Sequence, residues 1–379
     1  IAADVLLPAA LADGAPPAAT VHLIVDRREA RGSGAVRAAF LDRLGREAGL
    51  GGRVVERTLA VGDAVLVARY GMFSHRWIEM CERHGLDVRV VECEWGEGAP
   101  SERYAEILAD DPKHEIKAVL VTHNETATGV TSDIGAVRKA IDGASHPAML
   151  FVDCVSSLAS VPFRMDDWGV DIAVSGSQKG FMLHTGLAIL AVSPKALEAG
   201  ERATLPRTFF AFADMRAANA SGGFPYTPPL PLIMGMSESL KMLFEEGLEN
   251  VYARHHRLAG GVRHAVDAWG LSLCAKTPEL HSDTVSAILV PAGRDSDELV
   301  GHAFDAYHVS FGVGLGEMKG KAFRIGHLGA LTDVMVLSGL AAIEMAMADL
   351  DYPIRLGSGV AAAQEHFRAT RAQALDEAA

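Results

Sequence analysis

Between residues 64 and 193, short apolar segments rich in β-forming residues alternate with segments whose apolar residues recur at helical spacing. This alternation constrains the fold more than any other feature, because strands separated by helices form crossover units and a mostly parallel sheet that is buried on both faces. We therefore expect an α/β fold. The predicted strands cover 64–70, 88–94, 116–124, 148–155, 172–179 and 187–193. The predicted helices cover 74–85, 101–111 and 131–142, and a Ser or Thr is expected to cap the last of them.

Beyond this region the pattern changes, and we predict a large domain over 58–249 and a small domain over 250–379. The small domain has the mixed pattern of an α+β unit. Within the large domain, residues 221–232 are rich in Pro and Gly but contain aromatic residues, which favours an ordered loop. A long helix is expected to begin at Met236.

Residues 1–57 form a third, divergent segment. They are rich in Ala, Gly and Arg, with one plausible strand at 20–26 and one plausible amphipathic helix at 35–49. The apolar beginning lacks a basic start and is interrupted by Asp13 and three prolines, so we do not expect a signal peptide.

The charge balance and the cysteine pattern exclude several classes of protein. The chain has 35 Lys and Arg against 48 Asp and Glu, a net charge of −13 without a basic block, which disfavours nucleic-acid binding. Its longest apolar runs are far shorter than the roughly 20 residues that a membrane-spanning helix needs. Four widely separated cysteines without a CxxC pair disfavour a disulfide framework and favour a reducing cytoplasm. Four histidines lack metal-ligand spacing, so we expect no metal site at His123, His184, His255 or His256.

Two charged residues follow consecutive predicted strands. Asp153 closes the apolar run AMLFVD, and Lys179 follows IAVSGSQ, 26 residues later along the chain. Ligands of open α/β sheets bind at the carboxyl ends of the strands, where a carboxylate is costly unless it meets a cation. Alone, Asp153 would be a structural cap as readily as a functional acid, and Lys179 would be a surface lysine. Together they indicate a shared site.

The residue types around this pair match the requirements of pyridoxal phosphate. An amine such as that of Lys179 attaches covalently to the aldehyde of this cofactor. An acid such as Asp153 keeps the pyridine nitrogen protonated, so that the ring withdraws electrons from the substrate carbanion. The Ser-Gly-Ser-Gln sequence at 175–178 supplies hydrogen-bond donors for a phosphate, and Gly180 allows a tight turn.

Several motifs in a fixed order carry a resemblance to a known family. They are GDAVLVARYGMFSHRW, HNETATGV, FVDCVSS, VDIAVSGSQKGFML, FPYTPP and FRIGHLG. With these motifs the chain resembles the class V, fold-type I aminotransferases of the alanine–glyoxylate and serine–glyoxylate group, and within it the bacterial aspartate–glyoxylate aminotransferases. The resemblance covers residue 58 to the C-terminus and implies the fold-type I transferase architecture, with pyridoxal 5'-phosphate as cofactor.

The resemblance also implies roles around the cofactor ring. Lys179 corresponds to the lysine that binds the cofactor aldehyde and then carries a proton between Cα and C4′. Asp153 corresponds to the partner of the pyridinium nitrogen. Val155 and Phe73 would pack on opposite faces of the ring, and Thr126 would hydrogen-bond near the ring hydroxyl and the aspartate. Without its motif, Phe73 would be interpreted as a core aromatic residue.

Four further residues correspond to phosphate and substrate contacts. Gln178 would contact the phosphate, and Thr227, with Tyr226 nearby, would reach the phosphate of the neighbouring subunit. Arg324 would bind the substrate α-carboxylate, because its planar fork makes two parallel hydrogen bonds to a carboxylate. Two simpler interpretations remain open: Thr227 precedes two prolines and fits turn chemistry, and Arg324 fits an ordinary surface ion pair.

The activity implied by the resemblance is transamination by a ping-pong mechanism. The amino donor would be aspartate, serine or alanine, and glyoxylate would accept the amino group and become glycine. The partners are therefore small amino-acid and 2-oxo-acid substrates. The resemblance further implies a homodimer with shared active sites.

The N-terminal segment departs from the family. Relatives carry a Ser/Gly/Thr-rich turn followed by Trp-Glu-Ala-Ala, which opens a helix under the cofactor phosphate, and no such sequence occurs before residue 58. The Gly-Ser-Gly at 32–34 is a weak substitute. One hypothesis is a shifted reading frame, since codons can be chosen for residues 50–53 that read Trp-Glu-Ala-Ala one base later. We therefore expect weaker cofactor binding than in relatives that keep the turn.

Two other functions remain open. The chain could be a catalytically impaired relative with the same fold, or a dimeric scaffold. It could also keep the cofactor and act as a lyase or a desulfurase. A desulfurase needs a mobile cysteine, and Cys154 lies beside Asp153 at a buried strand end, which disfavours that reaction.

Overall fold

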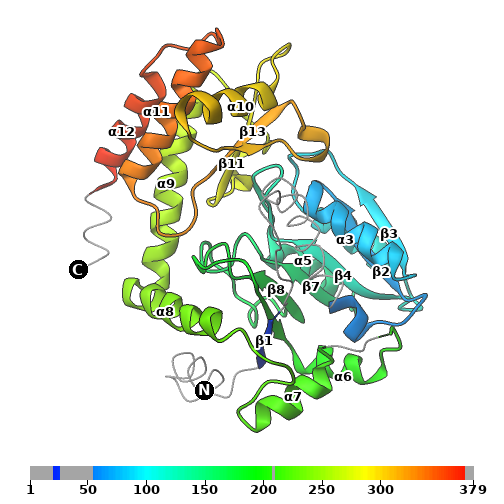
Figure 1. The fold of residues 1–379 in the computed structure, drawn as a ribbon. Coiled ribbons are helices and arrows are strands. Elements are labelled where there is room, and N and C mark those ends of the chain that lie inside the picture. Colours follow the sequence, from blue (N-terminus) through cyan, green and yellow to red (C-terminus); the bar gives the residue numbers. More distant parts are fainter. Residues whose placement is uncertain (1–19, 26–53, 207–209, 372–379) are drawn as a thin grey trace.

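The computed structural model describes residues 20–25, 54–206 and 210–371 of the chain (Figure 1). The strand predicted at 20–26 is present as β1 (Thr20–Val25). The helix predicted at 35–49 and the Gly-Ser-Gly at 32–34 lie outside the described residues.

The large domain is organised around a seven-stranded sheet of order β1-β9-β8-β7-β4-β2-β3. Neighbouring strands from β3 to β8 pair in parallel, whereas β9 pairs antiparallel with both β8 and β1. The mostly parallel sheet expected from the sequence is therefore confirmed. Its other strands are β2 (Ala64–Arg69), β3 (Asp87–Glu92), β4 (Ile116–Thr122), β7 (Met149–Asp153), β8 (Ile172–Gly176) and β9 (Leu187–Val192).

Alternate residues of the central strands face two different layers of core. In β2, Val65 and Val67 pack with helix α3 (Met72–Arg83) on one face, and Leu66 packs with the helices of the other face. Because both faces are covered, the strands are almost continuously apolar, which is why the sequence pattern identified them. The helices of the second face are α4 (Ser101–Ala109) and α5 (Ile134–Gly143).

Helix α5 begins at a different cap from the one expected. The side chain of Asp133 accepts the N–H of Ala136, so Asp133 is the N-cap and the predicted Ser or Thr cap is wrong. The hydroxyl of Ser132 instead accepts the N–H of Ala99, which lies just before α4.

The long helix expected to begin at Met236 also begins earlier than predicted, inside the stretch 221–232 that was expected to be a loop. Helix α8 (Leu230–Glu246) starts before Met236, because Pro231 lies in the first turn, where a proline removes no helical hydrogen bond. Gly247, with a φ of 84°, ends α8, and α9 (Leu248–Ala268) follows directly. Two shorter helices precede α8, namely α6 (Pro194–Arg202) and α7 (Phe212–Ala220).

The small domain contains an antiparallel four-stranded sheet of order β10-β11-β13-β12. Three helices and part of α9 share a hydrophobic core with this sheet, at the top of Figure 1. The strands are β10 (Ser272–Leu273), β11 (Val285–Leu289), β12 (Gly312–Val313) and β13 (Ala322–Gly326). The helices are α10 (Ser296–Tyr307), α11 (Asp333–Asp349) and α12 (Ser358–Ala369), with single 3₁₀ turns η1 (Pro278–Leu280) and η2 (Gly316–Met318).

Within the described residues, none of the helices combines the length and the apolar character that a membrane crossing requires.

Candidate active site

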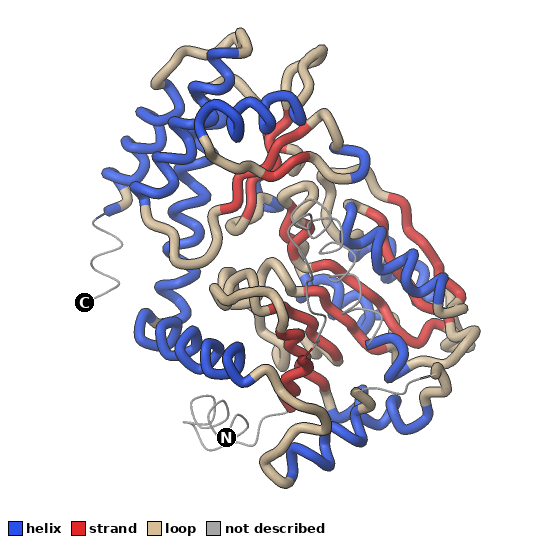
Figure 2. The backbone as a smooth tube through the Cα atoms, viewed as in Figure 1, coloured by secondary structure: helices blue, strands red, loops and turns tan. Residues whose placement is uncertain are grey.

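The predicted ring-side residues of the large domain gather where four neighbouring strands end. Phe73 follows β2, Thr126 follows β4, Asp153 ends β7 and Lys179 follows β8. These strands are parallel neighbours in the order β8-β7-β4-β2, so their carboxyl ends share one edge of the sheet. In Figure 2, tan loops lie between the strands of the large sheet and those of the small sheet.

Asp153 is held at the end of β7 by backbone hydrogen bonds. Its Oδ1 accepts the N–H of Val155 at 2.9 Å, and its carbonyl oxygen accepts the N–H of His123 at 2.8 Å. The residue is half-buried. Burial, together with the nearby charges of Glu125 and Asp153, raises the pKa of Tyr70 far above its usual value. The phenol of Tyr70 therefore stays neutral near pH 7.

Lys179 lies half-buried in a closed turn after β8. The hydroxyl of Ser177 donates to the carbonyl of His184 at 2.6 Å and accepts the N–H of Leu187 at 3.2 Å, which ties the two ends of the turn together. A side chain at Gly180 has no room, because its Cβ would lie 2.2 Å from the carbonyl oxygen of Leu158. The turn that carries Lys179 therefore packs directly on the segment that follows Asp153.

Gln178 and Val155 flank this pair. The side chain of Gln178 folds over Gly176, where an added Cβ would lie 2.8 Å from Oε1. Val155 is 8% exposed and belongs to the core on the α3 face of the sheet. Both residues therefore lie next to the strand ends that carry Asp153 and Lys179.

The motif HNETATGV forms a two-stranded hairpin of β5 (Asn124–Glu125) and β6 (Val130–Thr131). Ser156 connects it to the segment after Asp153. The hydroxyl of Thr126 donates to Ser156 Oγ at 2.8 Å, and Ser156 Oγ donates to the carbonyl of Asn124 at 2.8 Å. The proton of the Thr126 hydroxyl is thus engaged, so Thr126 can meet a ligand as an acceptor.

Phe73 lies half-buried at the start of α3. Its backbone N–H donates to the carboxylate of Glu125, at 3.0 Å to Oε2. Glu125 is fully buried, and burial raises its pKa, although N–H groups including that of Ser74 oppose this shift. The hairpin thus contacts the element that carries Phe73.

Arg324 comes to the hairpin from β13 of the small domain. Its Nη1 donates to the carbonyl of Thr126 at 3.2 Å, and its Nε donates to the carbonyl of Val313 at 3.0 Å. Arg324 is only 9% exposed, so the simpler interpretation of a surface ion pair does not hold. On the neighbouring strand, Gly312 leaves the room that this side chain needs, since a Cβ there would lie 3.0 Å from Arg324 Cβ. The predicted carboxylate-binding residue therefore meets the predicted ring-side segment.

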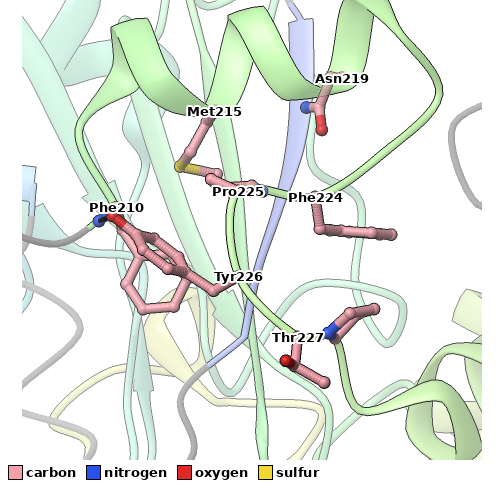
Figure 3. A pocket seen from close by; sticks show the side chains of 8 residues that line it. Phe210, Met215, Asn219, Phe224, Pro225, Tyr226 and Thr227 are labelled. Carbon is pink, nitrogen blue, oxygen red and sulfur yellow. Dashed lines mark hydrogen bonds between the residues drawn. The ribbon is translucent and has the colours of Figure 1, made fainter.

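Tyr226 and Thr227 lie elsewhere, in a small hollow whose lining all comes from the stretch 210–228 (Figure 3). The ring of Tyr226 packs edge-on against Phe210, with centroids 5.0 Å apart, and the Phe210 N–H donates to the Tyr226 hydroxyl at 3.4 Å. Thr227 is exposed. This hollow is built without any of the other predicted site residues.

The four histidines that lack metal-ligand spacing fall into two groups. His123 and His255 are buried, whereas His184 and His256 are exposed. Burial lowers the pKa of His123 to about 4, so its ring is neutral near pH 7, where it bonds to Ser157 Oγ at 2.9 Å. In the described parts of the chain, His, Cys, Asp and Glu side chains form no group of three that could hold a metal ion.

Sequence reasoning missed three residues that organise the site, namely Asn124, Glu125 and Ser156. All three lie inside the motifs HNETATGV and FVDCVSS, shortly after buried strands, and this position could have marked them as candidate site residues. The partners of Glu125 could not be predicted, because they lie more than 50 positions away in the sequence.

Comparisons with known proteins agree on one family. The model of the family described as aminotransferase class-V matches residues 52–314, so residues 1–51 lie outside the match. An L-aspartate–glyoxylate aminotransferase of Paracoccus denitrificans is 64% identical over 325 residues, covering 86% of this chain and 82% of the relative. A serine–glyoxylate aminotransferase of Hyphomicrobium methylovorum is 59% identical over 315 residues, covering 83% and 78%.

A solved structure agrees with these relatives. The pyridoxamine–pyruvate aminotransferase of Mesorhizobium loti matches with a TM-score of 0.80 at 28% identity, covering 92% of this chain and 84% of that one. All three proteins are named as aminotransferases, and two of the names contain glyoxylate.

Proposed function

The chain belongs to the class-V aminotransferase family, and from this we propose that it transfers the amino group of an L-amino acid to glyoxylate, giving glycine and a 2-oxo acid. The observation that carries the proposal is the 64% identity to an enzyme named for aspartate and glyoxylate. The serine-named relative shares the acceptor but not the donor. Glyoxylate is therefore the proposed acceptor, and aspartate, serine or alanine is the donor.

The cofactor of this family is pyridoxal phosphate, and the described residues fit it. Lys179 and Asp153 follow adjacent parallel strands, so an amine and a carboxylate approach one site from the same edge. A hydroxyl and an amide lie on neighbouring segments, at Thr126 in the hairpin after β4 and at Gln178 directly before Lys179. When bound, the cofactor supplies an aldehyde carbon for covalent attachment and a protonated ring that withdraws electrons from the substrate Cα.

Lys179 and Asp153 are the residues that we assign to the chemistry. The Nζ of Lys179 would hold the aldehyde of the cofactor, and the same amine, when free, would carry the proton that leaves the substrate Cα. The carboxylate of Asp153 stabilises the proton on the ring nitrogen, since an opposite charge raises the pKa of that nitrogen. The backbone bonds at both ends of Asp153 keep its carboxylate at the strand end.

Four further residues are assigned to orienting the ring and the substrate. Phe73 and Val155 would pack on the two faces of the cofactor ring, and Thr126 would accept a hydrogen bond near the ring hydroxyl. Arg324 binds the α-carboxylate of the substrate. Its hydrogen bonds to Thr126 and Val313 fix the plane of the guanidinium, which lowers the entropy lost on binding.

The remaining assignments concern the phosphate and the partner subunit. Gln178 contacts the phosphate of its own subunit, and Thr227, with Tyr226 beside it, contacts the phosphate of a second copy in a homodimer. The exposure of Thr227 supports this assignment, because a residue that serves a partner must be accessible in one chain. The cysteine pattern supports a cytoplasmic location.

One alternative has a specific observation in its favour. The family match begins at residue 52, so the region in which relatives carry the phosphate-binding turn is unmatched. This favours a relative with impaired cofactor binding over an unrelated reaction. A desulfurase is disfavoured, because the Cys154 thiol is fully buried, donates to the Val174 carbonyl at 3.1 Å and has a pKa raised far above its usual value by burial.

A panel of donors and acceptors tests the proposed function. Purified protein with excess pyridoxal phosphate is incubated with aspartate, serine or alanine and with glyoxylate, pyruvate or 2-oxoglutarate, and glycine formation is measured. We expect glyoxylate to give the highest kcat/KM, and the visible absorption of the protein to bleach with the donor alone. Lys179→Ala serves as the control for uncatalysed transfer. Turnover absent with every pair, in a protein that retains cofactor, would favour the scaffold.

A further inference from the structure

Glu125 is a carboxylate with no exposed surface, and none of the roles assigned above uses it. Its Oε2 accepts the N–H groups of Phe73 and Ser74, both at 3.0 Å. Its Oε1 accepts the N–H of Ala127 at 3.1 Å and lies 3.2 Å from the N of Phe73. One side chain thus joins the first turn of α3 to the hairpin that carries Thr126.

We propose that Glu125 is a positioning residue that fixes Phe73 and Thr126 relative to each other, so that the ring-stacking residue and the ring-side hydroxyl move as one unit. The inference rests on the proposed function, because that function gives Phe73 and Thr126 their meaning. The proposed role of Glu125 involves no contact with cofactor or substrate.

The bonds of Glu125 replace a local helix cap. Helix α3 has no side-chain cap of its own and no acidic residue in its first turn. The N–H groups of that turn lack intrahelical partners, and the helix dipole makes them favour a negative charge. A Ser, Thr or Asp at position 71 could satisfy them locally. The chain instead uses a carboxylate 52 residues further along, which couples two separate elements.

Gly71 supplies the space for this arrangement. A Cβ at position 71 would lie 2.2 Å from Glu125 Cγ and 2.3 Å from Cδ. The φ of Gly71 is 176°, an extended value that any residue can adopt, so its backbone conformation does not require glycine. The requirement is room for the Glu125 side chain.

The hairpin is itself held from two other sides. Asn124 Oδ1 accepts hydrogen bonds from Ser282 Oγ at 2.6 Å and Thr131 Oγ1 at 2.8 Å, and Arg324 bonds to the Thr126 carbonyl. Glu125 therefore connects α3 to a segment that the small domain already fixes. Its loss would free α3 at the site while leaving the hairpin in place.

Glu125→Gln tests the inference with little change in volume. In the cofactor-free protein, we expect amide hydrogen exchange over residues 72–75 to accelerate about tenfold or more, because two N–H groups lose a charged acceptor. In the loaded protein, we expect a weaker visible circular dichroism band of the cofactor. We also expect kcat to fall about tenfold or more with a smaller change in KM, since ring placement affects the transition state more than ground-state binding.

Glu344→Gln is the matched control. Glu344, inside α11, is also a buried carboxylate that bonds to the start of another helix: its Oε1 accepts the Gly359 N–H of α12 and the Trp269 indole N–H, both at 2.9 Å. It lies in the small domain, away from the strand ends. We expect this variant to lower thermal stability and to accelerate exchange at the start of α12, with the cofactor dichroism and kcat unchanged.

Gly71→Ala provides a second variant if Glu125→Gln does not fold, because the added methyl displaces the same carboxylate from the opposite side. Unchanged amide hydrogen exchange over residues 72–75 in these variants would show that Glu125 does not hold the start of α3, whatever the activity, and would overturn the proposal. If exchange is faster but the cofactor dichroism and kcat stay unchanged, as in Glu344→Gln, then Glu125 has only a structural role and the proposed positioning is wrong. A wild-type protein that binds no cofactor and transfers no amino group would refute the proposed function. The exchange measurement on the cofactor-free protein would still show whether Glu125 holds the start of α3.

Discussion

The predicted site residues fall into two regions that differ in how much of their environment one chain supplies. In the strand-end region, Thr126 is bonded to Ser156 and to Arg324, which come from distant parts of the chain. In the 210–228 segment, Tyr226 packs within its own stretch and Thr227 is exposed. One chain therefore carries Asp153, Lys179 and Arg324 in the strand-end region, whereas Thr227 is exposed, as the proposed shared site of a dimer requires.

The largest effect should come from the centre of the strand-end region. Lys179→Ala removes the amine that holds the aldehyde and carries the proton, so we expect turnover to be abolished. The turn should persist, because Ser177 and Gly180 maintain it, and thermal stability should stay near that of wild type. Steady-state assays with excess cofactor measure the first effect and thermal melting the second. A variant with even about a tenth of wild-type turnover, a loss of only about 1.4 kcal/mol, would remove Lys179 from the mechanism.

Asp153→Asn should have the next largest effect. The amide keeps the size of the side chain but loses the charge that holds the ring nitrogen protonated. We expect the barrier to rise by about 3–5 kcal/mol, which corresponds to roughly two to four powers of ten in kcat. Single-turnover absorbance with the amino donor measures the chemical step directly. Equal rates for the variant and the wild type would show that the carboxylate is only a cap.

The next largest effect should be a pH dependence of stability that comes from the strand-end region, where His123 is buried, and not from the 210–228 segment. Burial lowers the pKa of the His123 ring to about 4 from 6.5, and the backbone N–H of His123 donates to the backbone carbonyl of Asp153 at the strand end. The unfolded chain binds a proton below pH 6.5 while the folded ring stays neutral, so stability should fall as the pH drops from 6.5 toward 4. The loss attributable to this residue is at most about 3 kcal/mol.

His123→Gln should flatten that part of the pH profile, measured as the melting temperature at pH 7 and pH 5. His327, whose pKa burial lowers to about 3, should contribute a similar slope from the small domain and remain in the variant. The 210–228 segment contains no histidine and should add nothing. Identical pH slopes for the variant and the wild type would mean that His123 is accessible to protons in the folded state.

The sequence predicted the large sheet well because its pattern is local. Strands buried on both faces must be largely apolar, and β2 and β4 are so apart from Arg69, Lys117 and Thr122 near their ends. The errors occurred where two local signals compete. Ser132 and Asp133 are both good caps, and the choice depends on Ser132 meeting Ala99. Pro231 looked like a loop residue, although it also fits the first turn of a helix.

The candidate site was predicted only as far as its motifs reach. Asp153 and Lys179 could be singled out because charged residues after apolar strands are unusual. Glu125 could not, since its function depends on a contact with α3 that no local pattern encodes. The contact between Arg324 and Thr126 spans 198 residues and joins two domains. Such contacts follow from the packing of the whole chain.

The smallest effect should come from the outward-facing region. Thr227→Ala removes one hydroxyl that is exposed in a single chain, so the melting temperature of the cofactor-free protein should not change. If Thr227 donates to the phosphate of a partner subunit, cofactor affinity should fall about five- to tenfold, since one hydrogen bond contributes about 1 kcal/mol. Equilibrium dialysis measures this change. Ser221→Ala is the matched control, because its hydroxyl bonds to the Ala218 carbonyl in the same segment and has no proposed ligand. Equal cofactor affinity in Thr227→Ala and Ser221→Ala would show that Thr227 serves only to form the turn. The strand-end region would then be the whole of the site.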